Sequence, residues 1–321
     1  MPTRQGSIRL FQVGGISVFL HWSWFLVAAF EISYRGHSYS SLMWTGLEYL
    51  ALFVIVTMHE FGHALACRSV GGRANQIVLW PLGGVAYVDP PPRPGAVLWS
   101  IAAGPLVNVV LLPLLTIGLL ATYSWGWPSS APDVFGLLYA VWYINLALLI
   151  FNVLPVYPLD GGQILRALLW FFMGRARSLM VAVVIGFVSV AGLVALALWA
   201  PSIPVFGHVV QELRAQPIWL GIIAVFILMN CWRGLQQARV LARLAAAPRR
   251  EGFACPACHA APPQGALWKC GQCGTAFDTF VTHATCPKCG AQFAVTRCVD
   301  CGQLNPIDAW SVHASAPTTL P

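Results

Sequence analysis

The sequence predicts an all-α polytopic membrane protein with a small cysteine-rich module at its C-terminal end. Three observations predict this fold class. Of the 321 residues, 58% are hydrophobic and only 9% are charged, whereas charged residues make up about 25% of a typical soluble domain. The apolar residues come in long blocks, and eight of the 10 cysteines lie between residues 255 and 301.

Six apolar blocks are long enough to cross a membrane, because about 20 apolar residues span the hydrocarbon layer. They cover residues 14–33, 44–67, 97–121, 134–155, 178–200 and 217–235. The first block lacks the small-residue cleavage site of a signal peptide, so we expect it to be retained as the first span. The sequence therefore predicts six transmembrane helices.

A shorter apolar stretch at residues 76–88 is interrupted by proline and glycine and is too short for a helix across the bilayer. Irregular backbone is allowed at membrane depth where protein or water satisfies its polar groups. We expect a short membrane-associated β-hairpin or loop here.

The arginines predict the orientation of the chain. If the N-terminus is cytosolic, most arginines fall in cytosolic segments, and the outer loops hold only Arg35 and Arg214. This asymmetry follows the positive-inside rule. We expect a multi-pass protein of the plasma or inner membrane with both termini in the cytosol.

The second apolar block ends in His59-Glu60-Phe-Gly-His63. Two histidines four residues apart lie on one face of a helix, so both imidazoles can bind one metal ion, while Glu60 can act on a metal-bound water. The alternative is hydrogen bonding to neighbouring helices, but that role does not require this spacing. Because ionisable groups are costly inside a membrane, the motif predicts a catalytic zinc site.

A catalytic zinc site needs a third protein ligand and an open position for water. Other acidic residues fall near the outer face or, like Asp89, in a proline-rich loop, which leaves His21 and Asp160. Asp160 follows two prolines and precedes two glycines, a sequence that breaks a helix and can turn a carboxylate inward. We expect Asp160 to be the third ligand and His21 to hydrogen-bond a neighbour.

Two paired motifs carry a family resemblance: His59-Glu-Phe-Gly-His63 and Asn152-x-x-Pro-x-x-Pro-Leu-Asp160-Gly-Gly. Further matches are Pro81-Leu-Gly83-Gly84-Val and Ala103-Gly104-Pro105-Leu-Val-Asn108. Together they resemble the site-2 protease family of intramembrane zinc metalloproteases, and the compact bacterial branch related to the sporulation factor protease in particular. The resemblance covers roughly residues 14–236.

The resemblance implies that His59, His63 and Asp160 bind the catalytic zinc, that Glu60 is the general base, and that Asn152 helps to hold the substrate or the oxyanion. It implies an endopeptidase that cuts a membrane-spanning protein substrate, as in regulated intramembrane proteolysis.

Three further residues are expected to contact the substrate. Gly83 and Gly84 lie in the stretch that could clamp an unwound substrate by edge pairing, and Asn108 lies in the matched motif of the third span. The C-terminal tail departs from that branch, which often carries a nucleotide-sensing domain, so regulation is not inferred from relatives.

The C-terminal module contains four Cys-x-x-Cys pairs. They are Cys255/Cys258, Cys270/Cys273, Cys286/Cys289 and Cys298/Cys301. Each pair can supply half of a tetrahedral zinc site, and a glycine directly after three of the pairs permits the tight turn. Eight ligands imply two structural zinc ions. Sequential pairing, first with second and third with fourth, is the simplest and resembles a double zinc ribbon, while an interleaved pairing stays open.

Two alternative roles for the cysteines, disulfide bonds and haem attachment, fit the sequence less well than zinc binding. Disulfides do not suit a reducing cytosol. The c-type haem pattern at Cys255-Pro-Ala-Cys258-His259 would leave the other three pairs unexplained. The module also lacks the dense basic face of a nucleic-acid-binding domain, despite the net charge of +7. We expect a structural platform for a regulatory protein or the substrate.

The expected organisation is a transmembrane metalloprotease domain at residues 1–240, a linker at 241–254, a double zinc-ribbon-like domain at 255–305 and a disordered tail at 306–321. A catalytically inactive membrane scaffold that presents the ribbons to a partner is the alternative function, and the intact Glu60 favours the enzyme. A zinc transporter would need ionisable residues along several spans, which the third, fifth and sixth blocks lack.

Overall fold

The computed structural model describes residues 6–35, 39–80, 83–199 and 217–311. The chain divides into two compact units. The membrane unit comprises Met1–Pro90 and Pro94–Gln236, and the cysteine unit comprises Pro91–Arg93 and Gln237–Pro321.

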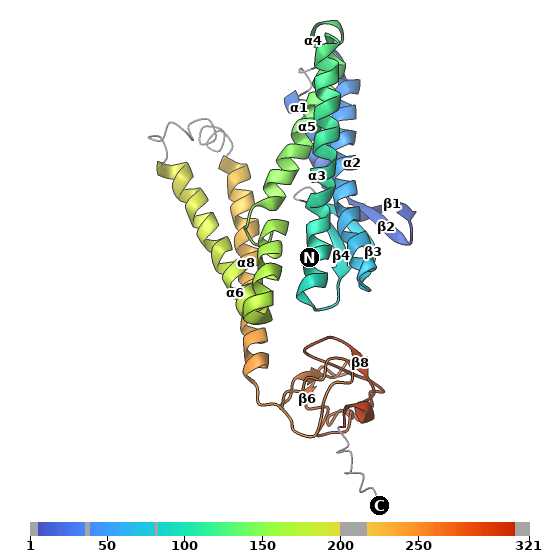
Figure 1. The fold of residues 1–321 in the computed structure, drawn as a ribbon, viewed down its shortest axis with the longest axis vertical. Coiled ribbons are helices and arrows are strands. Elements are labelled where there is room, and N and C mark those ends of the chain that lie inside the picture. The colour runs from blue at the N-terminus through green and yellow to red at the C-terminus, as the bar shows by residue number, and fades with distance from the viewer. Residues whose placement is uncertain (1–5, 36–38, 81–82, 200–216, 312–321) are drawn as a thin grey trace, which may run out of the picture. The chain divides into compact units, whose positions relative to one another are not determined.

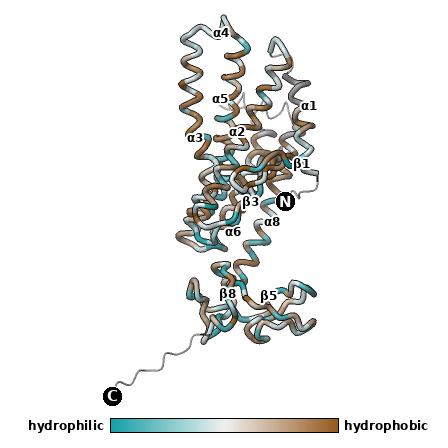
Figure 2. The backbone as a smooth tube through the Cα atoms, turned by 90° about the vertical axis from the view of Figure 1, so that its right-hand side faces the viewer, coloured by the Kyte–Doolittle hydropathy of each residue, from teal (hydrophilic) through white to brown (hydrophobic). Residues whose placement is uncertain are grey.

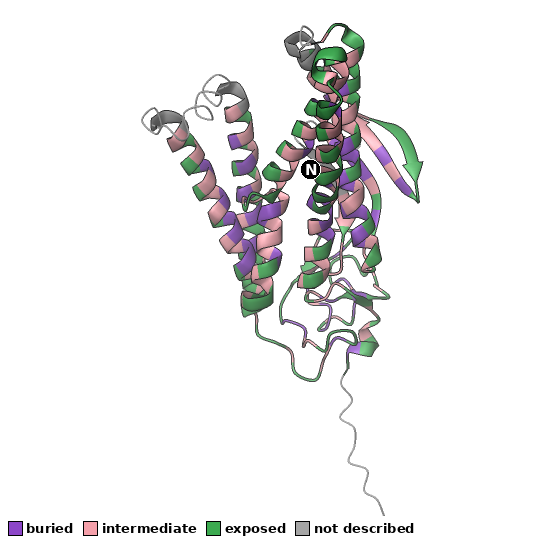
Figure 3. Ribbon diagram, turned by 45° about the horizontal axis from the view of Figure 1, so that its top comes forward, coloured by how far each residue is buried: buried purple, intermediate pink, exposed green. Residues whose placement is uncertain are grey.

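Within the described residues of the membrane unit, four helices are long and apolar enough to cross a membrane. They are α2 (Leu42–Ser69), α3 (Pro94–Ser124), α5 (Pro132–Val153) and α6 (Asp160–Trp199). Hydrophobic residues run along them (Figure 2), and many are exposed on the folded chain (Figure 3). A soluble unit would cover such long apolar surfaces, so this is a membrane protein.

The series of long helices contains one very short helix and one kinked helix. The helix α4 (Trp127–Ser130) lies between α3 and α5. Gly174 has a φ of 79°, so α6 is two helical segments that meet at a kink, and the second segment contains most of the predicted fifth span. The helix α8 (Pro217–Ala246) covers the predicted sixth block but is not among the four apolar candidates found in the described residues.

The predicted first span at residues 14–33 is not one helix. Its first part is the strand β2 (Ile16–His21), followed by the 12-residue helix α1 (Trp24–Arg35). Ile16 and Val18 alternate with less buried residues and pack in a core with residues of α2. An apolar run therefore formed a buried strand, which apolar content alone does not distinguish from a helix.

The strand β2 belongs to a four-stranded sheet beside α2 (Figure 1). The order is β1 (Ser7–Val13), β2, β3 (Arg73–Trp80) and β4 (Gly83–Asp89), in which β2 and β3 are parallel and the other pairs antiparallel. The predicted hairpin at residues 76–88 is confirmed as β3–β4. Arg68, at the end of α2, donates hydrogen bonds to the carbonyls of Ala74 (2.7 Å) and Gly15 (3.0 Å), which joins the helix to the sheet.

The cysteine unit contains little regular structure. Two small hairpins are formed by β5 (Trp268–Lys269) with β6 (Ala276–Phe277) and by β7 (Thr296–Arg297) with β8 (Leu304–Asn305), and η3 (Ile307–Trp310) is a 3-10 helix. Phe280 lies at the centre of an aromatic core, 5.1 Å from the Trp310 ring and 5.4 Å from the Trp268 ring.

The segments on either side of the predicted ribbon domain also fold into the cysteine unit. In the predicted linker, the Arg250 amide donates to the Pro262 carbonyl (2.9 Å) and the Arg250 side chain pairs with Asp278 (2.7 Å). In the predicted tail, Trp310 is buried in the aromatic core. Residues 312–321 of that tail lie outside the described residues.

Candidate metal centres

The first candidate centre lies in the second half of α2, the part of the helix that the sequence predicts to be near the cytosol. His59, Glu60 and His63 are all buried, although each is polar and lies in an apolar helix. One ligand atom from each lies within 4.8 Å of the others. The four-residue spacing therefore places both imidazoles and the carboxylate in one small region, as the sequence predicts.

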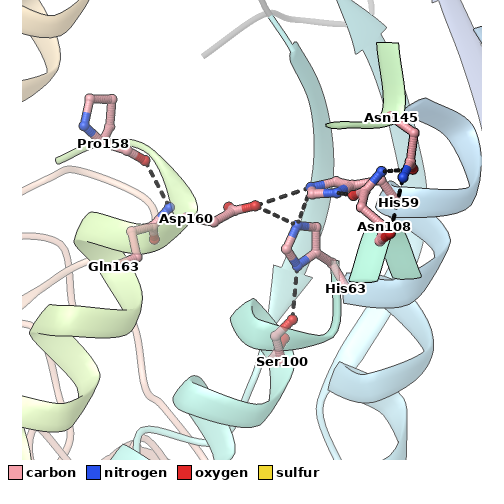
Figure 4. A network of polar contacts seen from close by, with 8 residues as sticks. All are labelled: His59, His63, Ser100, Asn108, Asn145, Pro158, Asp160 and Gln163. Carbon is pink, nitrogen blue, oxygen red and sulfur yellow. Dashed lines mark hydrogen bonds and ion pairs between the residues drawn. The ribbon is translucent and has the colours of Figure 1, made fainter. Parts of the chain in front are cut away.

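Asp160, the first residue of α6, completes this group (Figure 4). Its Oδ2 atom lies 3.0 Å from His59 Nε2 and 3.2 Å from His63 Nε2, and the two Nε2 atoms are 3.1 Å apart. Residues about a hundred positions apart in the chain thus present three ligand atoms to one point.

The hydrogen bonds of the two imidazoles fix which nitrogens face that point. His59 Nδ1 donates to Asn108 Oδ1 (2.6 Å), and His63 Nδ1 donates to the Ser100 carbonyl (2.9 Å). Since both acceptors are carbonyl oxygens, the protons of the neutral rings lie on Nδ1 and the Nε2 lone pairs face the carboxylate.

Three acceptors at such distances repel one another unless a cation lies between them. A tetrahedral zinc ion with bonds of about 2.0–2.1 Å separates its nitrogen and oxygen ligands by about 3.3 Å. The observed separations of 3.0–3.2 Å are close to this value. The residues present therefore fit a zinc ion.

The absence of side chains at two glycines lets α2 and α3 pack closely and leaves space for the His63 ring. A Cβ atom added at Gly104 would lie 2.2 Å from His63 Nε2, and one added at Gly62 would lie 2.6 Å from the Ala103 carbonyl oxygen. Both distances are shorter than van der Waals contact, so these two positions require glycine. The sequence motif Ala103-Gly104 is thus explained by packing against a ligand.

Asn108 and Asn145 form a buried amide pair behind His59. Asn108 Nδ2 donates to Asn145 Oδ1 (2.9 Å), and Asn145 Nδ2 donates to the Asn108 carbonyl (3.0 Å). Both side chains are 0% exposed, a position that does not fit the predicted contact of Asn108 with substrate. Asn145 was not among the predicted site residues, although a lone amide in an apolar span is a signal for a buried polar partner.

The remaining predicted residues lie around this centre. Asn152 is half-buried in the last turn of α5 and forms no hydrogen bond with the ligand residues in the described part of the chain. Gly83 and Gly84 begin β4, opposite Trp80 and Leu79 of β3. His21 Nδ1 hydrogen-bonds Ser23 Oγ, as predicted, rather than joining the other ligands.

The cysteine unit holds two further candidate centres, each formed by four cysteines. The outer cluster is Cys255, Cys258, Cys298 and Cys301, and the inner cluster is Cys270, Cys273, Cys286 and Cys289. Sulfur atoms from different pairs approach to 3.6–3.8 Å. A tetrahedral zinc ion with Zn–S bonds of about 2.3 Å separates its sulfurs by about 3.8 Å. Both clusters therefore fit zinc.

The pairing of the knuckles is nested, so the predicted sequential pairing is wrong. The first pair joins the fourth, and the second joins the third. The second and third pairs are joined by a short connection, whereas the aromatic core around Phe280 and Trp310 packs on both Cys255 and Cys298 and so brings the outer pairs together. The side chains of Arg249 and Asp300, 2.7 Å apart, connect the same two ends of the unit.

All four knuckles share one turn. The residue after the second cysteine donates its amide to the carbonyl of the first cysteine at 2.8–3.0 Å and has a positive φ. Gly274, Gly290 and Gly302 form the tight turn that the sequence predicts glycine to permit, with φ of 71–75°, and His259 adopts the same conformation with φ of 58°. In the inner cluster, the hydrogen bond with Thr275 lowers the pKa of Cys273 to about 6, which favours the thiolate that binds metal.

Comparison with known proteins shows what the membrane unit is similar to. The sequence pattern described as Peptidase family M50 matches residues 48–129 and 127–196, which include His59, Glu60, His63 and Asp160. The matched part of the membrane unit is therefore similar to this family.

Curated proteins similar to this chain carry related names. It is 37% identical over 186 residues to the Zinc metalloprotease MJ0392 of Methanocaldococcus jannaschii, which covers 56% of this chain and 50% of that protein. It is 29% identical over 245 residues to the Putative zinc metalloprotease sll0528 of Synechocystis sp., which covers 73% of this chain and 61% of that protein. The chain thus spans about half or somewhat more of these relatives.

Two more similarities concern the membrane unit. The chain is 34% identical over 121 residues to Stage IV sporulation protein FB of Bacillus subtilis, covering 36% of this chain and 38% of that protein. A solved structure, the Site-2 Protease from Methanocaldococcus jannaschii, superposes with a TM-score of 0.49 and 28% identity, covering 71% of this chain and 95% of that chain. The similarity to the family is carried by the sequence matches.

Proposed function

We propose that this chain is an intramembrane zinc metalloprotease that hydrolyses peptide bonds of membrane-tethered proteins. The proposal rests on one observation: two imidazole lone pairs and the Asp160 carboxylate meet at 3.0–3.2 Å beside the buried Glu60. The zinc metalloprotease names of the relatives support the same chemistry.

Each residue of the centre has a proposed role. His59, His63 and Asp160 are the zinc ligands, and bound zinc lowers the pKa of a coordinated water to about 7 and polarises a carbonyl. Glu60 accepts the proton of the attacking water and passes it to the leaving amine. Its burial in α2 next to His59 keeps the carboxylate within reach of both transfers.

The two amides near the centre have different proposed roles. Asn108, supported by Asn145, holds the His59 ring and its tautomer, which is the usual task of a hydrogen-bond partner behind a metal ligand. Asn152, eight residues before Asp160, is proposed to hold the substrate or the oxyanion, as the family resemblance implies.

A helical substrate must unwind before it is cut, because its carbonyls are engaged in hydrogen bonds. Among the described strands, β4 lies at one edge of the sheet and has β3 as its single neighbour. An edge strand can pair with an extended segment of another chain. We therefore place the proposed substrate contact of Gly83 and Gly84 on the backbone of β4.

The proposed topology has six crossings with both termini in the cytosol of the plasma or inner membrane. The helices α2, α3, α5 and α6 supply four of them, and α8 is proposed for another. The sixth is proposed for the predicted first block, in which the 12-residue helix α1 is too short to cross the bilayer by itself. The distribution of the arginines supports this orientation.

We further propose two structural zinc ions in the cysteine unit and a platform there for a regulatory protein, with no nucleic-acid partner. The proposed organisation is a protease domain up to residue 240, followed by a double zinc ribbon that contains residues 255–305. The hydrogen bonds of Arg250 and the burial of Trp310 favour a ribbon domain that extends beyond both predicted limits.

The test is cleavage of a co-expressed single-span reporter by Glu60→Gln, with Glu251→Gln as the control at an exposed position. Loss of the general base should lower cleavage by about 10²- to 10⁴-fold, while the zinc content stays that of the wild type. Reporter cleavage that is equal with wild type, with Glu60→Gln and in cells without the protein would instead support the scaffold alternative.

A further inference from the structure

Asp160 is the one proposed zinc ligand that does not lie on α2, so its position depends on the segment that leads into α6. We call residues 154–159, between α5 and α6, the Asp160 loop. A shift of this loop would move the carboxylate away from the fixed histidine pair. The residues that hold the loop in place therefore help to determine where the Asp160 carboxylate lies.

The first turn of α6 holds one side of the loop. Gln163 Nε2 donates to the Pro158 carbonyl at 3.1 Å (Figure 4). A Cβ atom added at Gly161 would lie 2.3 Å from the Val153 carbonyl oxygen, and one added at Gly162 would lie 2.4 Å from the Tyr157 nitrogen. The backbone of the loop thus lies directly against the helix that it precedes.

The other side of the loop is held by residues that are distant in sequence. The fully buried Cys231 of α8 places Sγ 3.3 Å from the Tyr157 carbonyl oxygen, three residues before Asp160. In the second segment of α6, a Cβ atom at Gly186 would lie 2.5 Å from Cys231 Sγ and 2.8 Å from the same oxygen. A Cβ atom at Gly234 would lie 2.7 Å from Val183 Cγ2 of α6 and 2.9 Å from Cε1 of the Tyr157 ring.

We propose that Gly186, Cys231 and Gly234 are positioning residues of the metal centre, which hold the Asp160 loop so that the carboxylate meets the two imidazoles. This inference rests on the proposed function of the site. None of the three residues contacts the ligand atoms, and they act through Tyr157. Two glycines permit α6 and α8 to approach the loop, and the Cys231 thiol donates to the carbonyl that the approach brings within reach.

The same helices contain matched control positions. Gly192 of α6 and Gly221 of α8 have no atom within 4 Å of an added Cβ. Substitution of these glycines by alanine makes the same chemical change in the same two helices without touching the loop. General effects of alanine on helix stability therefore cancel in the comparison.

The experiment measures how firmly the purified full-length protein retains zinc during dialysis against graded EDTA. The His59→Ala/His63→Ala double variant gives the zinc that is held by the cysteine clusters alone. We expect Gly186→Ala and Gly234→Ala to lose the remaining zinc at an EDTA concentration about tenfold lower than wild type, since supporting residues typically change metal affinity 10- to 100-fold. Gly192→Ala and Gly221→Ala should match wild type.

The thiol provides a second, gentler comparison. Cys231→Ser keeps a donor at this position and should retain zinc like wild type, whereas Cys231→Ala should release it earlier. If the glycine variants fail to fold, as judged by circular dichroism, this pair decides the matter. Equal retention by Cys231→Ala, Cys231→Ser and wild type would then overturn the proposal, and so would folded Gly186→Ala and Gly234→Ala proteins that behave like their controls.

The Asp160→Ala variant separates this inference from the proposed function. If Asp160→Ala retains zinc as wild type does, the proposed ligand set is wrong and the positioning role falls with it. If Asp160→Ala loses zinc while the glycine and cysteine variants do not, the ligand set stands and the positioning role alone is wrong.

Discussion

The membrane centre and the cysteine clusters reach similar ligand geometry by opposite routes. In the membrane unit the ligands come from two helices, and neighbouring groups such as Asn108 and the Ser100 carbonyl orient them. In the cysteine unit the ligands come in local knuckles whose own backbone forms the turn. In the membrane unit, the packing of the helices places the proposed ligands. In the cysteine unit, we expect the clusters themselves to hold together a chain that has little regular structure.

The sizes of the two supporting structures explain this difference. Two-residue strands and a small aromatic core cannot bury much apolar surface, and domains of this size depend on metals or other crosslinks. The membrane unit has helices of 22 to 40 residues. Metal should therefore matter for folding in one unit and for chemistry in the other.

Complete removal of metal gives the largest expected difference between the two units. Structural zinc in small domains contributes about 10–16 kcal/mol of binding free energy, which is also folding free energy. A strong chelator should unfold the cysteine unit and leave the helices of the membrane unit intact. Limited proteolysis after chelation checks this, with cuts expected within residues 255–301. Protection of that region in metal-free protein would remove the contrast.

Replacement of Asn108 by alanine is expected to have an intermediate effect. The change leaves His59 Nδ1 and Asn145 Oδ1 without their side-chain partner, and loss of such support typically costs 10- to 100-fold in metal affinity or activity. Zinc retention and reporter cleavage should both fall. Asn230→Ala is the matched control, because Asn230 in α8 donates to the Phe226 carbonyl of its own helix. A variant with unchanged zinc retention and a raised KM would restore the substrate-contact role.

The smallest expected effect comes from one knuckle turn. Gly274 has a φ of 71° and open space around an added Cβ, so Gly274→Ala changes backbone strain alone. The left-handed conformation costs a non-glycine residue about 1–2 kcal/mol. Gly271→Ala, in the same knuckle, also has open space but no positive φ and is the control. Denaturant unfolding of the zinc-loaded protein should separate the two variants, and coincident midpoints would show that the turn tolerates side chains.

Local chemistry made part of this molecule predictable from its sequence. The spacing of His59 and His63 fixes their common face, and the helix-breaking residues around Asp160 mark it as a ligand candidate. Each Cys-x-x-Cys pair likewise defines its own knuckle. These features depend on neighbours within a few residues, which a sequence displays directly.

Features that depend on distant contacts were not predictable in the same way. Ile16 and Val18 lie in a strand because β2 pairs with β3 and packs against α2, although the apolar composition of this segment resembles that of a transmembrane span. The nested pairing depends on the packing of Phe280 and Trp310, and Asn145 is explained only by its partner on another helix. In each case the deciding partner lies far away in the chain.

The nested order has a consequence for how metal enters the cysteine unit. Cys270 and Cys289 are 19 positions apart, whereas Cys255 and Cys301 are 46 positions apart. When the inner cluster closes first, fewer residues remain free in the loop that the outer cluster must close. Because the entropic cost of loop closure depends on the logarithm of loop length, this lowers the free-energy cost of closing the outer loop by about 0.5 kcal/mol. This free energy corresponds to about a twofold difference in affinity, so we expect the inner cluster to load slightly ahead of the outer one and to ease the closure of the outer ring.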